Sequence, residues 1–159
     1  MGGKVCLAYL VILILATPIF AQIRTIVVDK PSLQLYAIEN ADTLFSAPIC
    51  AGCNFGDKLK KGDHKTPEGV FSISQIQNSS EWKHDFGDGK GLISGAYGPW
   101  FFRLKTPKWT SIGIHGTCFP KSIGKRESEG CVRLNNEDLL KLKPFIKIGM
   151  KVIITKDEM

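Results

Sequence analysis

A histidine, a cysteine and an arginine stand close together in the sequence, and their types suit nucleophilic catalysis. His115 ends a short apolar run, Gly130 comes directly before Cys131, and Arg133 follows two positions later. A cysteine thiolate attacks carbonyl groups when an imidazole positions or deprotonates it, and an arginine holds carboxylates well. These residues therefore predict a site that attacks a carbonyl group, with Cys131 as the nucleophile and His115 as its partner.

The residues around the cysteine support this interpretation. Gly130 permits close approach of a substrate to the backbone, and it tolerates a positive φ. Backbone N–H groups in such a turn are candidates to stabilise an oxyanion, and Ser128 is expected to form a hydrogen bond within the site. A single histidine or a single Gly-Cys step is usually structural, so the joint occurrence of these residues carries the prediction.

The segments that must position these residues read mainly as β-strands. Apolar residues that alternate with polar ones, or that are β-branched, predict strands over 24–29, 34–38, 43–49, 70–73, 100–104, 111–114 and 152–155. The strand over 111–114 would deliver His115. One helix is expected, because the cap-forming and acidic residues 135–138 precede the apolar residues 139–142, and Pro144 limits it. The sequence therefore predicts a mainly β protein with one short helix after Cys131.

Two polar segments interrupt this pattern. Residues 54–66 are rich in lysine and are expected to form a solvated loop, whereas residues 77–91 are polar and contain glycines. A long loop of the second kind often covers a site, so we expect 77–91 to flank the site as a lid. Tyr97 is a candidate to line the substrate groove, and Trp100 is expected in the core.

Residues 1–21 have the pattern of a secretory signal peptide. Lys4 is basic, an apolar stretch follows from Val5 to Ala16, and Ala21 is a small residue suited to cleavage before Gln22. An uncleaved membrane anchor is the alternative, but the stretch is shorter than the ~20 residues that a membrane span needs. We expect export to the periplasm or cell envelope, with residues 22–159 forming one domain.

The charge of the chain is modestly positive. The net charge is +6 at pH 7, and removal of Lys4 with the signal peptide leaves +5. Such a balance favours attraction to an anionic polymer or an envelope surface, although a soluble protein with no charged partner accounts for it equally well. Export and the lack of a concentrated basic stripe argue against nucleic acid as a partner.

Four cysteines follow the expected signal peptide: Cys50, Cys53, Cys118 and Cys131. An even number in an oxidising compartment suggests disulfides, but a nucleophilic Cys131 leaves at most one intramolecular pair. In an extended strand, Cys50 and Cys53 would be roughly 10 Å apart, beyond the ~7 Å limit for a disulfide, so bridging them requires a turn. Pairing of Cys118 with Cys50 or Cys53, and a redox lock between Cys118 and Cys131, both stay open.

Two separated motifs resemble the L,D-transpeptidase catalytic domain. Residues 113–117 (Gly-Ile-His-Gly-Thr) together with 128–136 resemble the family's signature, and residues 66–73 resemble its upstream Thr-Pro-x-Gly-x-Phe block. The hairpin that includes residues 34–36 and the terminal segment 149–154 also fit. The resemblance spans nearly all of residues 22–159, and it implies the β-sandwich of that family.

The resemblance also implies roles for single residues. Cys131 would be the catalytic nucleophile and His115 its imidazole partner. The substrate or oxyanion site would be formed by Gly116, Ser128, Gly130 and Arg133. Many members have histidine where this chain has Glu129, so a second imidazole is absent at that position. A carboxylate beside the nucleophile raises the pKa of a thiol, which would slow the reaction.

An activity is implied by the same resemblance. Members of this family act on peptidoglycan stem peptides, so Cys131 would form a thioester and release a terminal D-amino acid. The amine of another stem would resolve the thioester to a 3→3 cross-link, whereas a protein lysine would give attachment of that protein to the wall. Attack by water would instead give L,D-carboxypeptidase activity. No metal or organic cofactor is implied, and we assume a monomer.

Three other interpretations compete with this one. His115, Cys118 and Cys131, completed by His84 or Cys53, are ligand types that suit zinc, although their spacing is irregular. The pair Cys50 and Cys53 has the spacing of a thiol–disulfide site, but residues 54–57 directly after it are poor helix formers. The third is a non-catalytic wall-binding domain that kept the fold without turnover.

Overall fold

The computed structural model describes residues 24–157. The predicted signal peptide, residues 1–21, lies outside the described residues. Among the residues that are described, no helix is long and apolar enough to cross a membrane.

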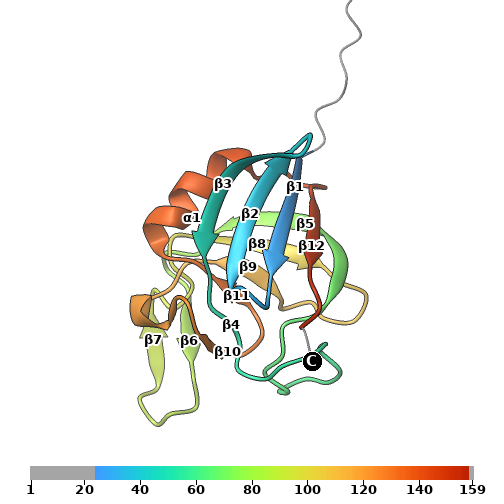
Figure 1. The fold of residues 1–159 in the computed structure, drawn as a ribbon. Coiled ribbons are helices and arrows are strands. Elements are labelled where there is room, and N and C mark those ends of the chain that lie inside the picture. The colour runs from blue at the N-terminus through green and yellow to red at the C-terminus, as the bar shows by residue number, and fades with distance from the viewer. Residues whose placement is uncertain (1–23, 158–159) are drawn as a thin grey trace, which may run out of the picture.

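A sheet of eight strands forms the body of the molecule (Figure 1). Its order is β11-β9-β8-β5-β12-β1-β2-β3, so the first and last strands of the chain lie side by side in its middle. The bounds are β1 (Arg24–Asp29), β2 (Gln34–Glu39), β3 (Asp42–Pro48), β5 (Gly69–Asn78), β8 (Trp100–Lys105), β9 (Gly113–His115), β11 (Val132–Arg133) and β12 (Lys151–Ile154). Two small sheets join β4 (Ala51–Gly52) to β10 (Arg126–Ser128) and β6 (Lys83–Asp85) to β7 (Leu92–Ser94).

The sheet curls, and its two halves enclose the core. Strand β5 pairs with β12 through Gly69–Ser72 and with β8 through Ser72–Asn78, and the register shifts between Ile73 and Gln75. Such a bulge bends a strand and increases its twist, so β5 passes from one half of the sheet to the other. Figure 1 shows β1, β2 and β3 lying across β8 and β9. The predicted mainly β architecture is confirmed.

Alternation along the first hairpin supplies one side of the core. Ile26 and Val28 of β1, together with Leu35 and Ala37 of β2, are buried, while the residues between them face outward. They pack in one cluster with residues from β8, β9, β11 and the helix, among them Phe102, Ile114, Val132 and Leu139. The strands that carry His115 and Arg133 are thus fixed by the central core.

The predicted helix is confirmed as α1 (Asn136–Leu142). The side chain of Asn135 accepts a hydrogen bond from the N–H of Glu137, as an N-cap does. A 3₁₀ turn, η2 (Lys143–Phe145), follows and contains Pro144, which cannot continue an α-helix. A second 3₁₀ turn, η1 (Pro120–Ser122), lies between β9 and β10.

The prediction of a loop over 77–91 is wrong in part. Strand β5 continues to Asn78 because it pairs with β8 as far as Trp100, and Lys83–Asp85 forms β6 in a hairpin with β7. These two strands have three residues each and are mostly exposed, too short to show a recognisable apolar alternation. The ladder with a partner strand, rather than the local sequence, makes them extended.

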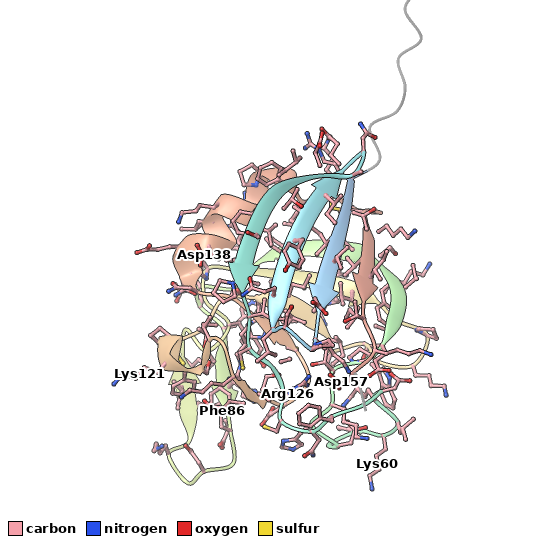
Figure 2. The ribbon with its side chains drawn as sticks, viewed as in Figure 1. Lys60, Phe86, Lys121, Arg126, Asp138 and Asp157 are labelled. Atoms are coloured by element: carbon pink, nitrogen blue, oxygen red, sulfur yellow. The ribbon has the colours of Figure 1, made fainter. Side chains whose placement is uncertain are left out.

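A buried lysine ties the C-terminal segment to two loops. Lys30 is fully buried, and its Nζ lies 2.7 Å from Glu68 Oε1 and 2.9 Å from Asp157 Oδ2. It also donates to the carbonyl oxygens of Gly56 and Thr66. Arg126 reaches the same Asp157 (Figure 2). Burial acts to raise the pKa of Asp157, but the Gly56 N–H together with Lys30 and Arg126 holds it below its usual range.

Candidate functional site

A cleft of about 690 Å³ brings together three of the residues that the sequence analysis selected. Cys131, His115 and Arg133 line it, as does Tyr97, the candidate groove residue. Glu129, from the same turn as Cys131, also lines it, and the rest of the lining comes from three other parts of the chain: Lys58, Lys61, Gly62 and His64; His84, Phe86 and Ala96; and Lys108, Trp109, Thr110, Ser111 and Ile112. The hairpin β6–β7 thus borders the cleft with His84 and the adjoining Phe86.

The turn between β10 and β11 presents Cys131. Ser128, which is fully buried, donates to the carbonyl oxygen of Cys131 at 2.6 Å and accepts from the N–H of Gly130 at 3.1 Å. Gly130 has φ 129°, and a Cβ there would lie 2.7 Å from the carbonyl oxygen of Lys65. Gly130 and Ser128 therefore shape the turn that carries the thiol. Neither of them lines the cleft.

The Cys131 thiol contacts the segment before β9, and its pKa is raised. It donates to the carbonyl oxygen of Ser111 at 3.4 Å. Burial raises the pKa of Cys131, the Gly113 backbone and the guanidinium groups of Arg133 and Arg103 act to lower it, and Glu129 acts to raise it. Glu129 was expected from the sequence to raise the pKa of this thiol, and it acts in that direction, but burial is the larger cause.

His115 is held as a neutral imidazole. Strands β9 and β11 run parallel with His115 opposite Arg133, which brings the histidine next to the cysteine turn. Its Nδ1 lies 2.6 Å from the carbonyl oxygen of Gly116. Because a carbonyl only accepts, Nδ1 carries the proton and Nε2 keeps its lone pair. Burial lowers the pKa of His115 to about 3.

Aromatic rings fix the plane of this imidazole. The ring of Phe101 stacks on it with centroids 5.2 Å apart and an interplanar angle of 11°. The ring of Tyr97 meets it edge-on at 5.0 Å. The imidazole has little freedom to rotate, so the face it offers the cleft is set before any ligand enters.

Gly116 has a packing role. A Cβ there would lie 2.1 Å from Oδ1 of Asn136, the first residue of α1. That oxygen accepts from the N–H of Thr117 at 2.8 Å. The glycine thus lets the start of the helix lock onto the segment after His115.

Arg133 is nearly buried in the wall of the cleft. Its side chain donates to the carbonyl oxygen of Glu127 at 3.4 Å, and its guanidinium carbon lies 5.6 Å from the centre of the Phe86 ring. These contacts leave the guanidinium beside the thiol with no carboxylate partner among residues 24–157. It is placed to meet a carboxylate that enters the cleft.

A hydrogen-bonded chain across the cleft was not foreseen from the sequence. Nε2 of His84 donates to Glu129 at 3.0 Å, and the hydroxyl group of Tyr97 lies 3.0 Å from His84 Nδ1. The hairpin is thereby joined to the residue next to Gly130. His84 had been considered only as a metal ligand, and no local signal indicates its partner because 45 positions separate it from Glu129.

The geometry does not support the competing metal site. Within residues 24–157, no group of three or more histidine, cysteine, aspartate or glutamate side chains is close enough to hold a metal ion. The four cysteines of this range are unpaired: Cys50 is buried, Cys53 exposed, and Cys118 and Cys131 partly exposed. Cys50 leads directly into the extended strand β4, so the turn that a Cys50–Cys53 disulfide needs is absent there.

Comparison with known proteins identifies relatives. The model of the L,D-transpeptidase catalytic domain family (YkuD) matches residues 23–154. L,D-transpeptidase YkuD of Bacillus licheniformis is 41% identical over 91 residues, which are 57% of this chain and 46% of that protein. L,D-transpeptidase YqjB of Bacillus subtilis is 33% identical over 98 residues, 61% of this chain and 56% of that protein. The matched region thus spans about half the length of these curated relatives.

Solved structures of L,D-transpeptidases share the fold of this chain. L,D-transpeptidase 3 from Mycobacterium tuberculosis superimposes with a TM-score of 0.63 at 15% identity, over 85% of this chain and 61% of that one. Identity at that level speaks for the fold alone. The curled sheet and the one short α-helix of residues 24–157 agree with that fold. The family match over 23–154 covers nearly every described residue. The chain therefore belongs to the family of L,D-transpeptidase catalytic domains.

Proposed function

We propose that this protein is a cysteine L,D-transpeptidase that acts on peptidoglycan stem peptides. The observation that carries the proposal is the cleft in which the Cys131 thiol, the His115 imidazole and Arg133, which has no ion-pair partner within residues 24–157, come together. A thiol nucleophile, a base and a carboxylate-binding cation are what acyl transfer from a peptide with a free C-terminus requires.

The first step is the formation of a thioester. The sulfur of Cys131 attacks the carbonyl carbon that precedes the terminal D-residue, and its proton passes to Nε2 of His115. The C–N bond then breaks, and the same proton is delivered to the departing amine, which leaves as the D-amino acid. Burial raises the pKa of the thiol and lowers that of the imidazole, and both shifts disfavour an ion pair before the attack. Proton transfer therefore accompanies the attack.

The second step decides the product. An amine from another stem attacks the thioester, gives up a proton to His115 and restores the thiol, which yields a 3→3 cross-link. A protein lysine in the same role attaches that protein to the wall, and water gives L,D-carboxypeptidase activity. Gly130, Ser128 and Gly116 support this chemistry by shaping the cysteine turn and the segment after His115.

Acylation by a β-lactam tests the nucleophile. The M. tuberculosis L,D-transpeptidase 3 structure holds a faropenem-derived adduct. We expect faropenem to add one adduct mass to the wild-type protein and to Cys118→Ala, and none to Cys131→Ala. Cys118 is the matched control because it is partly exposed but is not among the residues that line the cleft. An adduct on the Cys131→Ala protein would refute the assignment.

Turnover of a stem tetrapeptide tests the reaction. We expect release of the terminal D-amino acid together with a cross-linked product when a second stem is supplied. Tripeptide alone, with no cross-link, would identify a carboxypeptidase. Binding to isolated cell walls that survives in Cys131→Ala, without any turnover by the wild type, would identify the non-catalytic alternative.

We also propose that the protein is exported and cleaved between Ala21 and Gln22. The apolar stretch within residues 1–21 and the peptidoglycan substrate support this proposal. The intact mass of the protein recovered from the cell envelope should correspond to residues 22–159. A mass that includes residues 1–21 would instead indicate an uncleaved anchor.

A further inference from the structure

The lysine-rich segment expected to be a solvated loop forms a wall of the cleft. Lys58, Lys61 and His64 face it from this segment, and Lys108 and Trp109 face it from the segment before β9. The Nζ of Lys58 lies 5.3 Å from the centre of the Trp109 ring, which joins the two segments. We call these five residues, Lys58, Lys61, His64, Lys108 and Trp109, the lysine wall.

One aspartate folds the first of these segments. The carboxylate of Asp63 accepts from Nζ of Lys58 at 2.7 Å and from the N–H groups of Leu59, Lys60 and Lys65 at 2.7, 3.0 and 3.2 Å. Burial acts to raise the pKa of Asp63, but these donors together hold it well below its usual range. The loop is therefore shaped before any ligand arrives, and Lys30 fastens both of its ends through Gly56 and Thr66.

The cleft has more positive charge than its own acids neutralise. Glu129 is the single acidic residue among those that line it, and His84 is hydrogen-bonded to it. Lys58 is paired with Asp63. Within residues 24–157, three cleft cations form no ion pair: Lys61, Lys108 and Arg133. A cavity lined by one sign of charge attracts ligands of the opposite sign.

The lysine wall stands directly beside the nucleophile. The carbonyl oxygen of Ser111, two residues beyond Trp109, accepts the hydrogen bond of the Cys131 thiol. At the other segment, the carbonyl oxygen of Lys65 lies so near Gly130 that no side chain fits between them. A ligand group bound by Lys61 and Lys108 is thus part of the molecule whose carbonyl meets the thiol, and Arg133 offers a separate cation.

We propose that the lysine wall binds a non-terminal carboxylate of the acyl-donor peptide and so selects anionic stems over amidated ones. This inference rests on the proposed transpeptidase function. Lys61 and Lys108 supply the charge, and Trp109 offers an apolar face for the aliphatic part of the same residue. The terminal carboxylate of the donor goes to Arg133, so the two anionic groups of one peptide have different sites.

The test compares matched donor peptides on matched variants. One tetrapeptide keeps its non-terminal carboxylates, and in its partners each of these is replaced in turn by a carboxamide. The enzyme variants are the Lys61→Met, Lys108→Met double substitution and the control Lys60→Met. Lys60 belongs to the same loop, but its side chain points away from the molecule and does not line the cleft (Figure 2).

Wild type and Lys60→Met should show a KM about three- to tenfold lower for the peptide with carboxylates, as expected for two exposed ion pairs. Amidation at one of the tested positions should account for this difference in KM, and kcat should be unchanged. In the double variant this preference should disappear, and added salt should weaken it in the wild type.

Two results overturn the inference alone. These are turnover by the wild type with no preference between carboxylate and carboxamide, and a preference that persists in the double variant. Absence of any D-amino acid release by the wild type would overturn the proposed function, and with it this inference. The faropenem adduct on Cys131 distinguishes that case from an inactive preparation, because an active thiol is acylated in either event.

Discussion

Acidification should destabilise this fold through His115. In the native protein this buried imidazole has a pKa of about 3, whereas the ordinary value is 6.5. Below pH 6.5 the unfolded chain gains a proton at His115 that the native state does not accept until about pH 3. The unfolded state thus binds more protons across this window, so stability is present above it and is lost as the pH falls through it.

The magnitude is set by the two pKa values. At about pH 4.5 the unfolded histidine is two pH units below its pKa of 6.5 and the native one is still neutral. At about 1.36 kcal/mol per pH unit this is a cost of about 2.7 kcal/mol, against about 0.2 at pH 7. His115 alone should therefore remove about 2.5 kcal/mol of unfolding free energy between these two conditions.

Urea unfolding, followed by tryptophan fluorescence at both pH values, measures this loss. The comparison is with His115→Asn, whose amide nitrogen can still donate to the carbonyl oxygen of Gly116. All other groups titrate in both proteins, so the stability of the wild type relative to the variant should fall by about 2.5 kcal/mol on acidification. A difference that stays constant with pH would refute a depressed pKa for His115. Where the variant does not fold, an NMR titration of the wild-type imidazole decides the same point.

Three further substitutions test the architecture around the cleft. Gly130→Ala should cost about 1–3 kcal/mol in urea unfolding and abolish acylation by faropenem, because the new Cβ meets the Lys65 carbonyl at a positive φ; wild-type stability would contradict the close approach. Lys30→Met should cost about 3–5 kcal/mol, since it leaves Glu68 and Asp157 with a missing partner; an unchanged urea midpoint would show that the buried cluster contributes nothing. Glu129→Gln should lower the pKa of Cys131, so alkylation by iodoacetamide near pH 8 should be faster than in the wild type; a slower reaction would mean that the contact with His84 matters more than the charge.

Local patterns predicted most of the scaffold. β-Branched residues located β1 and alternation located β2, and the cap-forming Asn135 and Pro144 marked the limits of α1 and of the turn after it. The grouping of His115, Cys131 and Arg133 in one cleft was also foreseen. These features depend on residues close in sequence or on one recurring motif, so a local signal exists for each.

Other features had no such signal. The hairpin β6–β7 has strands of only three residues, and its contribution of His84 to the cleft depends on Glu129 and Tyr97, which other segments supply. The segment that carries Lys58 and Lys61 was expected to be a solvated loop, because the sequence around Asp63 and these lysines does not indicate which surface they face. The packing of Gly116 against Asn136 likewise had no local signal, whereas a hydrogen bond of Ser128 within the site had been expected.

The sequence by itself determined the chemistry available to this protein: a thiol, an imidazole and a guanidinium on a mainly β scaffold. Only the tertiary structure decided their states. The neutrality of His115 comes from its burial, which outweighs the opposing hydrogen bond to the Gly116 carbonyl, and the raised pKa of Cys131 comes from desolvation. The positive wall beside the thiol depends on two loops, distant in the sequence, that meet through Lys58 and Trp109. Burial and charge density are properties of packed neighbours, and packing is decided by the whole fold.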